Sequence, residues 1–228
     1  MCGRITLTYD ISAVNRYLNG LFDISLDSSY QLPRYNIAPS QDVIAVIRDV
    51  NSYRAGAIKW GLIPPDAPAK YQGFKSINLR QETLMKAKKY HDSLQIRRCL
   101  IIADGFYEWQ KGASSSQPYW ITHRDHSLMM LAGIWGKHMN EEGIKTYTAA
   151  ILTTEADASM QTIHPRMPVI ISPETARRWL DSSIDGQSIL KTITLPDITH
   201  QLTLTPISTR VNHAGRDDPS LIEPITLV

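Results

Sequence analysis

Runs of apolar residues alternate with polar stretches along the chain, and their composition predicts both strands and helices. Five segments are rich in β-branched or aromatic residues and most are bounded by turn residues, which predicts strands at 42–50, 98–110, 118–123, 128–138 and 146–154. Helices are predicted over 11–22, 81–94, 155–163 and 173–183. The last helix begins Ser172-Pro173-Glu174, an N-cap residue followed by proline in the first turn.

The order of these elements favours an α+β fold. The stretch GASSSQ at 112–117 predicts a surface hairpin loop between two strands. Strands joined by short loops, with helices interspersed between them, argue against a doubly wound parallel sheet. The chain of 228 residues has the length of one domain. We therefore predict a single α+β domain over residues 1–228, with a mixed, mostly antiparallel, barrel-like sheet and flanking helices.

The composition is that of ordinary globular material. The chain is 43% hydrophobic and 20% charged, which excludes disorder as its main state. It has no run of about 18 apolar residues that would span a membrane. The first residues, MCGRITLTYD, lack the basic-then-apolar order of a signal peptide. Cys2 and Cys99 have no spacing typical of a zinc or iron–sulfur site. We expect a cytoplasmic protein without a metal or small-molecule cofactor.

The charge balance allows a nucleic-acid partner without requiring one. The 24 Lys and Arg residues nearly balance the 22 Asp and Glu residues, for a net charge of +2. This is less basic than a protein that binds nucleic acid mainly through its charge. The lysines at 86, 88 and 89 are as well explained by the solvated face of a helix.

Cys2 is notable for its position next to the initiator methionine. If Met1 is removed, Cys2 offers an α-amine with a pKa near 8 and a thiol with a pKa near 8.5. The amine can condense with an aldehyde to an imine, and the neighbouring thiolate can then close a five-membered thiazolidine ring. Because the second step is intramolecular, its entropic cost is small. The alternative is that Cys2 is a small buried residue of a first strand.

Three further residues could carry chemistry, and each has a structural alternative. Asn78, in SINLRQET, could gather hydrogen bonds around an anion or could cap a helix. Glu108 lies between two aromatic residues, where a partly desolvated carboxyl would suit proton transfer; it could equally face solvent. His164, in IHPRMPVI, could act as an acid or base or be purely structural.

Together these segments resemble the SRAP family, the SOS response-associated peptidases, which are also described as abasic-site processing proteins. The resemblance covers essentially the whole chain, in the family's order. Leu79 within the Asn-x-Arg motif is a minor variation. The matching segments are MCGR (1–4), RYNIAP (34–39), WGLIP (60–64), INLRQET (77–83), ADGFYEW (103–109), IHPRMPVI (163–170), PISTRVN (206–212) and the closing LIEP.

The resemblance implies a protein that binds single-stranded DNA at an abasic site; we expect it to be a monomer. Cys2, exposed by self-removal of Met1, would form a thiazolidine with the ring-opened sugar aldehyde and so shield the lesion. Asn78 would hold the lesion, Glu108 would orient the α-amine and move protons, and His164 would assist opening of the sugar ring. Cross-link reversal and weak strand cleavage are further expectations. The residues expected to contact DNA are Arg4, Asn36, an exposed wedge of Pro39 or Trp60, Arg80 and Arg166.

Other classes of protein remain open from the residues alone. An N-terminal-nucleophile amidohydrolase, such as a class II glutamine amidotransferase, also begins with a processed Met-Cys-Gly. That class has no use for the RYNIAP, INLRQET and IHPRMP segments. A DNA-binding module in which Cys2 is incidental and a cysteine protease acting on other proteins are two further alternatives.

Overall fold

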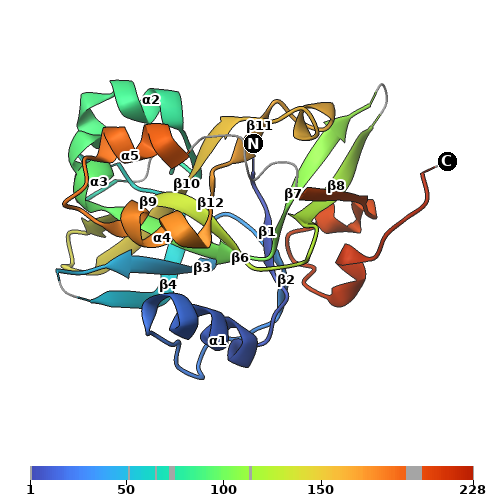
Figure 1. Cartoon of the computed structure of the whole chain (residues 1–228), viewed down its shortest axis with the longest axis horizontal. Helices are drawn as coiled ribbons and strands as arrows, with labels where there is room; N and C mark the ends of the chain where they lie inside the picture. The colour runs from blue at the N-terminus through green and yellow to red at the C-terminus, as the bar shows by residue number, and fades with distance from the viewer. Residues whose placement is uncertain are drawn as a thin grey trace.

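Two β-sheets and five α-helices make up the described part of the chain (Figure 1). The structure is a computed structural model and describes residues 2–50, 52–64, 66–71, 75–112, 115–193 and 202–227. Residues 113 and 114 of the predicted hairpin loop lie outside this range. The loop does join two antiparallel strands, and Gly112 N–H donates to Ser115 O across it at 2.8 Å.

The larger sheet closes on itself. Its ring consists of β10 (Lys145–Glu155), β4 (Tyr53–Trp60), β3 (Asp42–Arg48), β6 (Arg98–Ala103) and β9 (Met129–Met139), and β9 pairs back onto β10. Only the β4–β10 pairing is parallel within this ring. Closure leaves no open edge in the ring, which is the defining property of a barrel.

Three short strands extend this barrel, and two of them position the site described below. β5 (Asn78–Arg80) runs parallel to β10 beyond the end of its pairing with β4. β11 (Arg166–Pro168) pairs with the opposite edge of β10, and β12 (Ile170–Ile171) pairs with β9. β5 and β11 therefore flank the same end of β10.

The smaller sheet is antiparallel throughout. Its order is β13 (Leu202–Pro206), β8 (Ser116–His123), β7 (Gly105–Lys111), β1 (Ile5–Leu7) and β2 (Arg34–Ile37). β6 and β7 follow each other in sequence but belong to different sheets. Asp104 lies between them, and its carboxylate accepts hydrogen bonds from the Thr6 hydroxyl at 2.6 Å and the Thr8 amide at 2.8 Å. These bonds fix β1 to the start of β7.

The helices bury one face each against a core that both sheets share. In α1 (Ile11–Phe22) the buried residues are Val14, Leu18 and Phe22, one helical turn apart, and the Asp10 carboxylate caps its first turn. α4 (Pro173–Leu180) and α5 (Gly186–Ile193) likewise bury an apolar face. One continuous cluster of buried side chains reaches from β1 and β7 to the barrel and these helices. The predicted α+β fold with a barrel-like, mostly antiparallel sheet is confirmed.

Three predicted elements are wrong in extent. The strand predicted at 98–110 is two strands, β6 and β7, because Asp104 turns the chain from one sheet to the other. The helix predicted at 81–94 is interrupted at Ala87, whose extended backbone separates α2 (Gln81–Lys86) from the turn Lys88–Tyr90 and α3 (His91–Ile96). The helix predicted at 155–163 is only the 3-10 turn Met160–Thr162, since β10 extends to Glu155.

Candidate functional site

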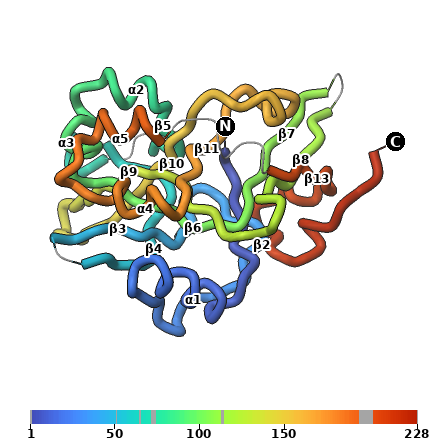
Figure 2. Tube along the Cα trace, in the orientation of Figure 1, coloured from blue at the N-terminus to red at the C-terminus, as the bar shows by residue number. Residues whose placement is uncertain are grey.

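The N-terminal segment enters between the two sheets (Figure 2). Tyr107 N–H, in β7 of the smaller sheet, donates to Arg4 O at 2.9 Å. This bond continues the β1–β7 register one residue beyond Ile5 and Phe106. On the other side, the Asn78 side chain of β5 contacts Cys2. The second residue of the chain is therefore held by both sheets.

The Cys2 side chain is completely buried. Its exposed fraction is 0%, and its thiol lies 4.0 Å from Arg4 O, to which it donates. Burial raises the pKa of this thiol well above its usual range, and the negative charge of Glu108 acts in the same direction. The resting sulfur is thus a thiol, and its attack on a substrate requires a group that takes its proton.

Asn78 holds the backbone of Cys2. Its Nδ2 donates to Cys2 O at 2.7 Å, while its Oδ1 is buried and accepts no hydrogen bond in the described part of the chain. The alternative role as a helix cap is wrong, because α2 begins after Arg80 and has no side-chain cap. Asn78 therefore offers a spare acceptor directly beside the reactive residue.

Glu108 is buried on the same side of the site. Its exposed fraction is 2%, so the alternative of a solvent-facing strand residue is wrong. Burial raises the pKa of its carboxyl above the ordinary value, and the positive charge of His164 acts in the opposite direction. A carboxyl with a raised pKa beside a thiol and an imidazole is suited to accepting and donating a proton.

His164 reaches the site from the barrel. It lies between the 3-10 turn at Met160 and strand β11, and its Nδ1 accepts a hydrogen bond from Arg166 N–H at 3.0 Å. Arg166 O lies 3.0 Å from the same nitrogen, so the Arg166 backbone can bond to either tautomer of the ring. The Gln110 side chain also donates to Thr162 O at 2.8 Å, which joins β7 to the segment that carries His164.

Four segments distant in sequence thus bring all four predicted chemical residues together. Asn78 bonds to Cys2, and the charge of Glu108 acts on Cys2 while that of His164 acts on Glu108. The grouping holds a nucleophile, a carboxyl for proton transfer, an imidazole and a hydrogen-bonding amide. In the described part of the chain no group of three or more His, Cys, Asp or Glu side chains could hold a metal ion.

Two of the residues expected to contact DNA make hydrogen bonds inside the protein. Asn36 is fully buried; its Oδ1 accepts from the Arg4 guanidinium at 2.6 Å, and its Nδ2 donates to Arg216 O at 2.7 Å and to His213 O at 3.0 Å. Arg4 also donates to Val211 O at 2.9 Å. Their polar groups are engaged in fixing the C-terminal segment, so the prediction that Asn36 contacts DNA is corrected.

The expectation of an exposed tryptophan wedge is also wrong. Trp60 has an exposed fraction of 0%, because the end of β4 places its ring in the core and its indole N–H donates to Ile77 O at 2.9 Å. Pro39 is half-buried and Arg80 is exposed. Arg166 is paired with Glu82, which is not among the residues predicted from the sequence. The glutamate was visible in INLRQET, but nothing in its spacing indicates a partner more than eighty residues away.

The whole-chain comparisons agree with the motifs. The family model for SOS response associated peptidase (SRAP) matches residues 1–214. The chain belongs to the SRAP family. It is 35% identical over 224 residues to abasic site processing protein YoqW of Bacillus subtilis, covering 98% of this chain and 99% of the relative. It is 31% identical to abasic site processing protein HMCES of Xenopus tropicalis, covering 88% of this chain and 69% of the relative.

A solved structure has the same fold. A protein from Bacteroides thetaiotaomicron, determined by X-ray crystallography, superimposes with a TM-score of 0.82 at 18% identity and covers 99% of this chain and 100% of its own. At this identity the likeness concerns the fold of the SRAP chain alone.

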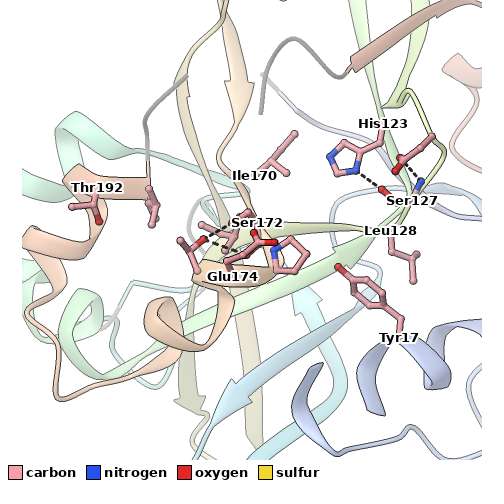
Figure 3. Close-up of a pocket in the computed structure, with 13 residues that line it drawn as sticks. Tyr17, His123, Ser127, Leu128, Ile170, Ser172, Glu174 and Thr192 are labelled. Carbon is pink, nitrogen blue, oxygen red and sulfur yellow. Dashed lines mark hydrogen bonds between the residues drawn. The ribbon is translucent and has the colours of Figure 1, made fainter. Parts of the chain in front are cut away.

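A cavity of about 580 Å³ lies elsewhere in the SRAP fold (Figure 3). It is lined by side chains from α1, the β8–β9 turn and the start of α4, among them Tyr17, His123 and Glu174, which point into it. None of the four residues of the candidate site lines it.

Among the described residues no helix is long and apolar enough to cross a membrane.

Proposed function

We propose that this chain captures abasic sites in single-stranded DNA through a covalent thiazolidine at Cys2. The observation that carries the proposal is the meeting of Cys2, Asn78, Glu108 and His164 between the two sheets. Membership of the SRAP family and relatives named abasic site processing proteins support the substrate.

The capture needs the two nucleophiles of a processed Cys2. The α-amine attacks the aldehyde of the ring-opened sugar, a carbon–nitrogen double bond forms, and the aldehyde oxygen leaves as water. The sulfur then adds to the imine carbon, and the thiol proton ends on the ring nitrogen. Holding both nucleophiles on adjacent carbons makes the second step intramolecular. Removal of Met1 is therefore a requirement of the proposal.

Glu108 and His164 move the protons. The Cys2 thiol is protonated at rest because burial raises its pKa, and the Glu108 carboxyl beside it can relay that proton. In its imidazolium form His164 can give its Nε2 proton to the sugar ring oxygen as the ring opens, and Arg166 O can hold the proton that remains on Nδ1. Run backwards, the same two groups would reverse the cross-link.

Asn78 and Arg80 hold the lesion. The spare Oδ1 of Asn78 can accept a hydrogen bond from a hydroxyl group of the opened sugar or from the α-amine. Arg80 follows on the same strand and is exposed, which suits a contact with a neighbouring phosphate. Single-stranded DNA suits these contacts, because they recognise the sugar and a phosphate at the lesion and involve no base.

The proposal predicts a heat-stable adduct. Purified protein is incubated with single-stranded DNA that contains one abasic site, boiled in denaturant and run on a gel. We expect a shifted band with the wild-type protein and none with Cys2→Ser, which keeps a small polar group but lacks the sulfur. Mass spectrometry of the cross-linked protein should find Met1 absent. A heat-stable adduct with Cys2→Ser, or with Met1 in place, overturns the mechanism.

The same preparation separates the alternatives. Cys2-dependent release of ammonia from glutamine would indicate an amidohydrolase, and cleavage of peptides in trans would indicate a protease. If DNA affinity is unchanged in Cys2→Ala and no adduct forms with protein lacking Met1, the chain is a simple DNA-binding module. Strand cleavage at the lesion would report β-elimination from the imine.

A further inference from the structure

We propose that Glu82 is a positioning residue that acts on His164 through Arg166. This inference deepens the proposed function and rests on it for its consequence, but the geometry that carries it is independent of DNA. Neither the family resemblance nor the sequence motifs assigned Glu82 a role.

Glu82 and Arg166 form a two-pronged ion pair. Arg166 Nη1 donates to Glu82 Oε1 at 2.8 Å and Nη2 donates to Glu82 Oε2 at 3.0 Å. Nη2 also donates to Thr153 O at 2.7 Å in β10. The hydrogen bonds from Arg166 lower the pKa of the Glu82 carboxyl, so this carboxylate is ionised at neutral pH. The guanidinium is thus fixed at three points, and its side chain is only 12% exposed.

Arg166 in turn holds the imidazole of His164. Its amide N–H donates to His164 Nδ1 at 3.0 Å, and its carbonyl oxygen lies 3.0 Å from the same nitrogen. A neutral ring with its proton on Nε2 accepts from the amide, whereas a ring protonated on Nδ1 donates to the carbonyl. A displacement of the Arg166 backbone would therefore alter both the orientation of the ring and its tautomer.

One short segment then positions both halves of the site. Asn78 and Glu82 are four residues apart, at β5 and the first turn of α2. Asn78 fixes the backbone of Cys2, and Glu82 fixes the residue that orients His164. The pairing of β5 and β11 on opposite edges of β10 keeps these two contacts in register. Residues 78–82 thereby hold in place both Cys2 and the segment that orients His164, which come from distant parts of the chain.

The pair also determines what Arg166 can do for DNA. A guanidinium already bonded to a carboxylate carries little net charge toward a phosphate. Glu82 therefore reduces the charge that Arg166 presents to a phosphate, while Arg80, two residues before Glu82, is exposed.

The test uses DNA-free protein first. Long-range ¹H–¹⁵N correlation spectra of histidine-labelled protein report the tautomer of each imidazole, and His164→Asn identifies the signals of His164. We expect the Nε2–H form in the wild-type protein and a mixture of tautomers in Glu82→Gln. Glu174→Gln is the matched control, because Glu174 is also an acidic residue in the first turn of a short helix. An unchanged His164 signal in Glu82→Gln overturns the proposal, whether or not the protein cross-links.

The second readout is the rate of adduct formation. We expect Glu82→Gln to slow it roughly 10-fold and to shift its pH profile, as loss of a charge-assisted contact to a proton-transfer group should. Affinity for an uncross-linked strand should stay within about twofold, and Glu82→Asp should recover part of the rate. Glu82→Gln should have no further effect in an Arg166→Gln background, because both changes break the same pair. Additive losses would mean that Glu82 does not act through Arg166.

Discussion

The side chain of Asn78 donates a 2.7 Å hydrogen bond to the backbone carbonyl of Cys2, across 76 positions of sequence. The bond ties the N-terminal segment to the barrel, while the β1–β7 register ties it to the smaller sheet. A residue at a chain terminus is ordinarily free to move. Here its backbone is fixed from two sides, which suits a nucleophile that must meet its substrate in one orientation.

Replacing Asn78 should separate cross-linking from binding. In Asn78→Ala the Cys2 carbonyl loses its donor and the spare acceptor disappears, so we expect the rate of adduct formation to fall roughly 10-fold to 100-fold. Affinity for intact single-stranded DNA should change little. Single-turnover gel assays and fluorescence anisotropy measure the two quantities. Asn19→Ala, on the exposed face of α1, is the control; an equal loss of affinity and rate in Asn78→Ala would contradict the assignment.

Glu108 should make the protein less stable as the pH rises. Its pKa is raised above the ordinary 4.5 by burial, so the folded state binds this proton more tightly than the unfolded state does. The stability that Glu108 contributes is complete below its unfolded pKa and is lost as the pH rises through the folded one. Glu108→Gln cannot ionise at this position, so it does not lose this stability as the pH rises. We expect its Tm to match wild type near about pH 4 and to exceed it by roughly 2–4 °C near about pH 8.

Thermal unfolding of the wild-type and Glu108→Gln proteins between about pH 4 and about pH 8 checks the direction of this pH dependence. Glu82→Gln provides the opposite case, because Arg166 lowers the pKa of Glu82. The stability that Glu82 contributes is present above its unfolded pKa and lost as the pH falls, so Glu82→Gln should be the less stable protein at neutral pH. If Glu108→Gln were instead the less stable protein at high pH, the carboxylate would be ionised and well paired in the folded state.

Asn36 should matter for folding rather than for DNA. Its amide bonds to Arg4 and to two backbone carbonyls of the C-terminal segment while fully buried. Asn36→Ala leaves those groups unpaired, and we expect a loss of about 2–3 kcal/mol of unfolding free energy, or roughly 5–10 °C in Tm. Protein that remains folded should bind DNA with wild-type affinity. A specific loss of affinity at unchanged Tm would restore Asn36 as a DNA contact.

Arg80 should account for part of the salt dependence of DNA binding. It is exposed on the strand that carries Asn78. In Arg80→Gln we expect weaker binding on all sequences and a slope of log K against log salt reduced by about 1. Arg54→Gln, in the β3–β4 hairpin, removes the same charge from an exposed site and should leave the slope unchanged. Equal changes in both variants would show a general effect of net charge.

The sequence alone determined the fold class and the family resemblance, and it predicted the chemical residues. Local composition is enough for elements such as α1, whose predicted bounds agree with the structure, and for β9 and β10 to within one residue at each end. Short motifs identify Cys2, Asn78, Glu108 and His164 because chemistry demands particular residue types. The sequence did not predict β4, because its alternation of small, basic and aromatic residues is a weak strand signal.

Only the tertiary structure decided which way each polar side chain faces. Trp60 and Asn36 lie in segments that look suited to DNA, yet closure of the barrel and the return of the C-terminal segment bury them. Arg80 and Arg166 are both arginines in family motifs, and the position of Glu82 pairs one and leaves the other exposed. Burial and pairing depend on contacts between residues far apart in the chain. No local pattern of hydrophobic and polar positions contains that information.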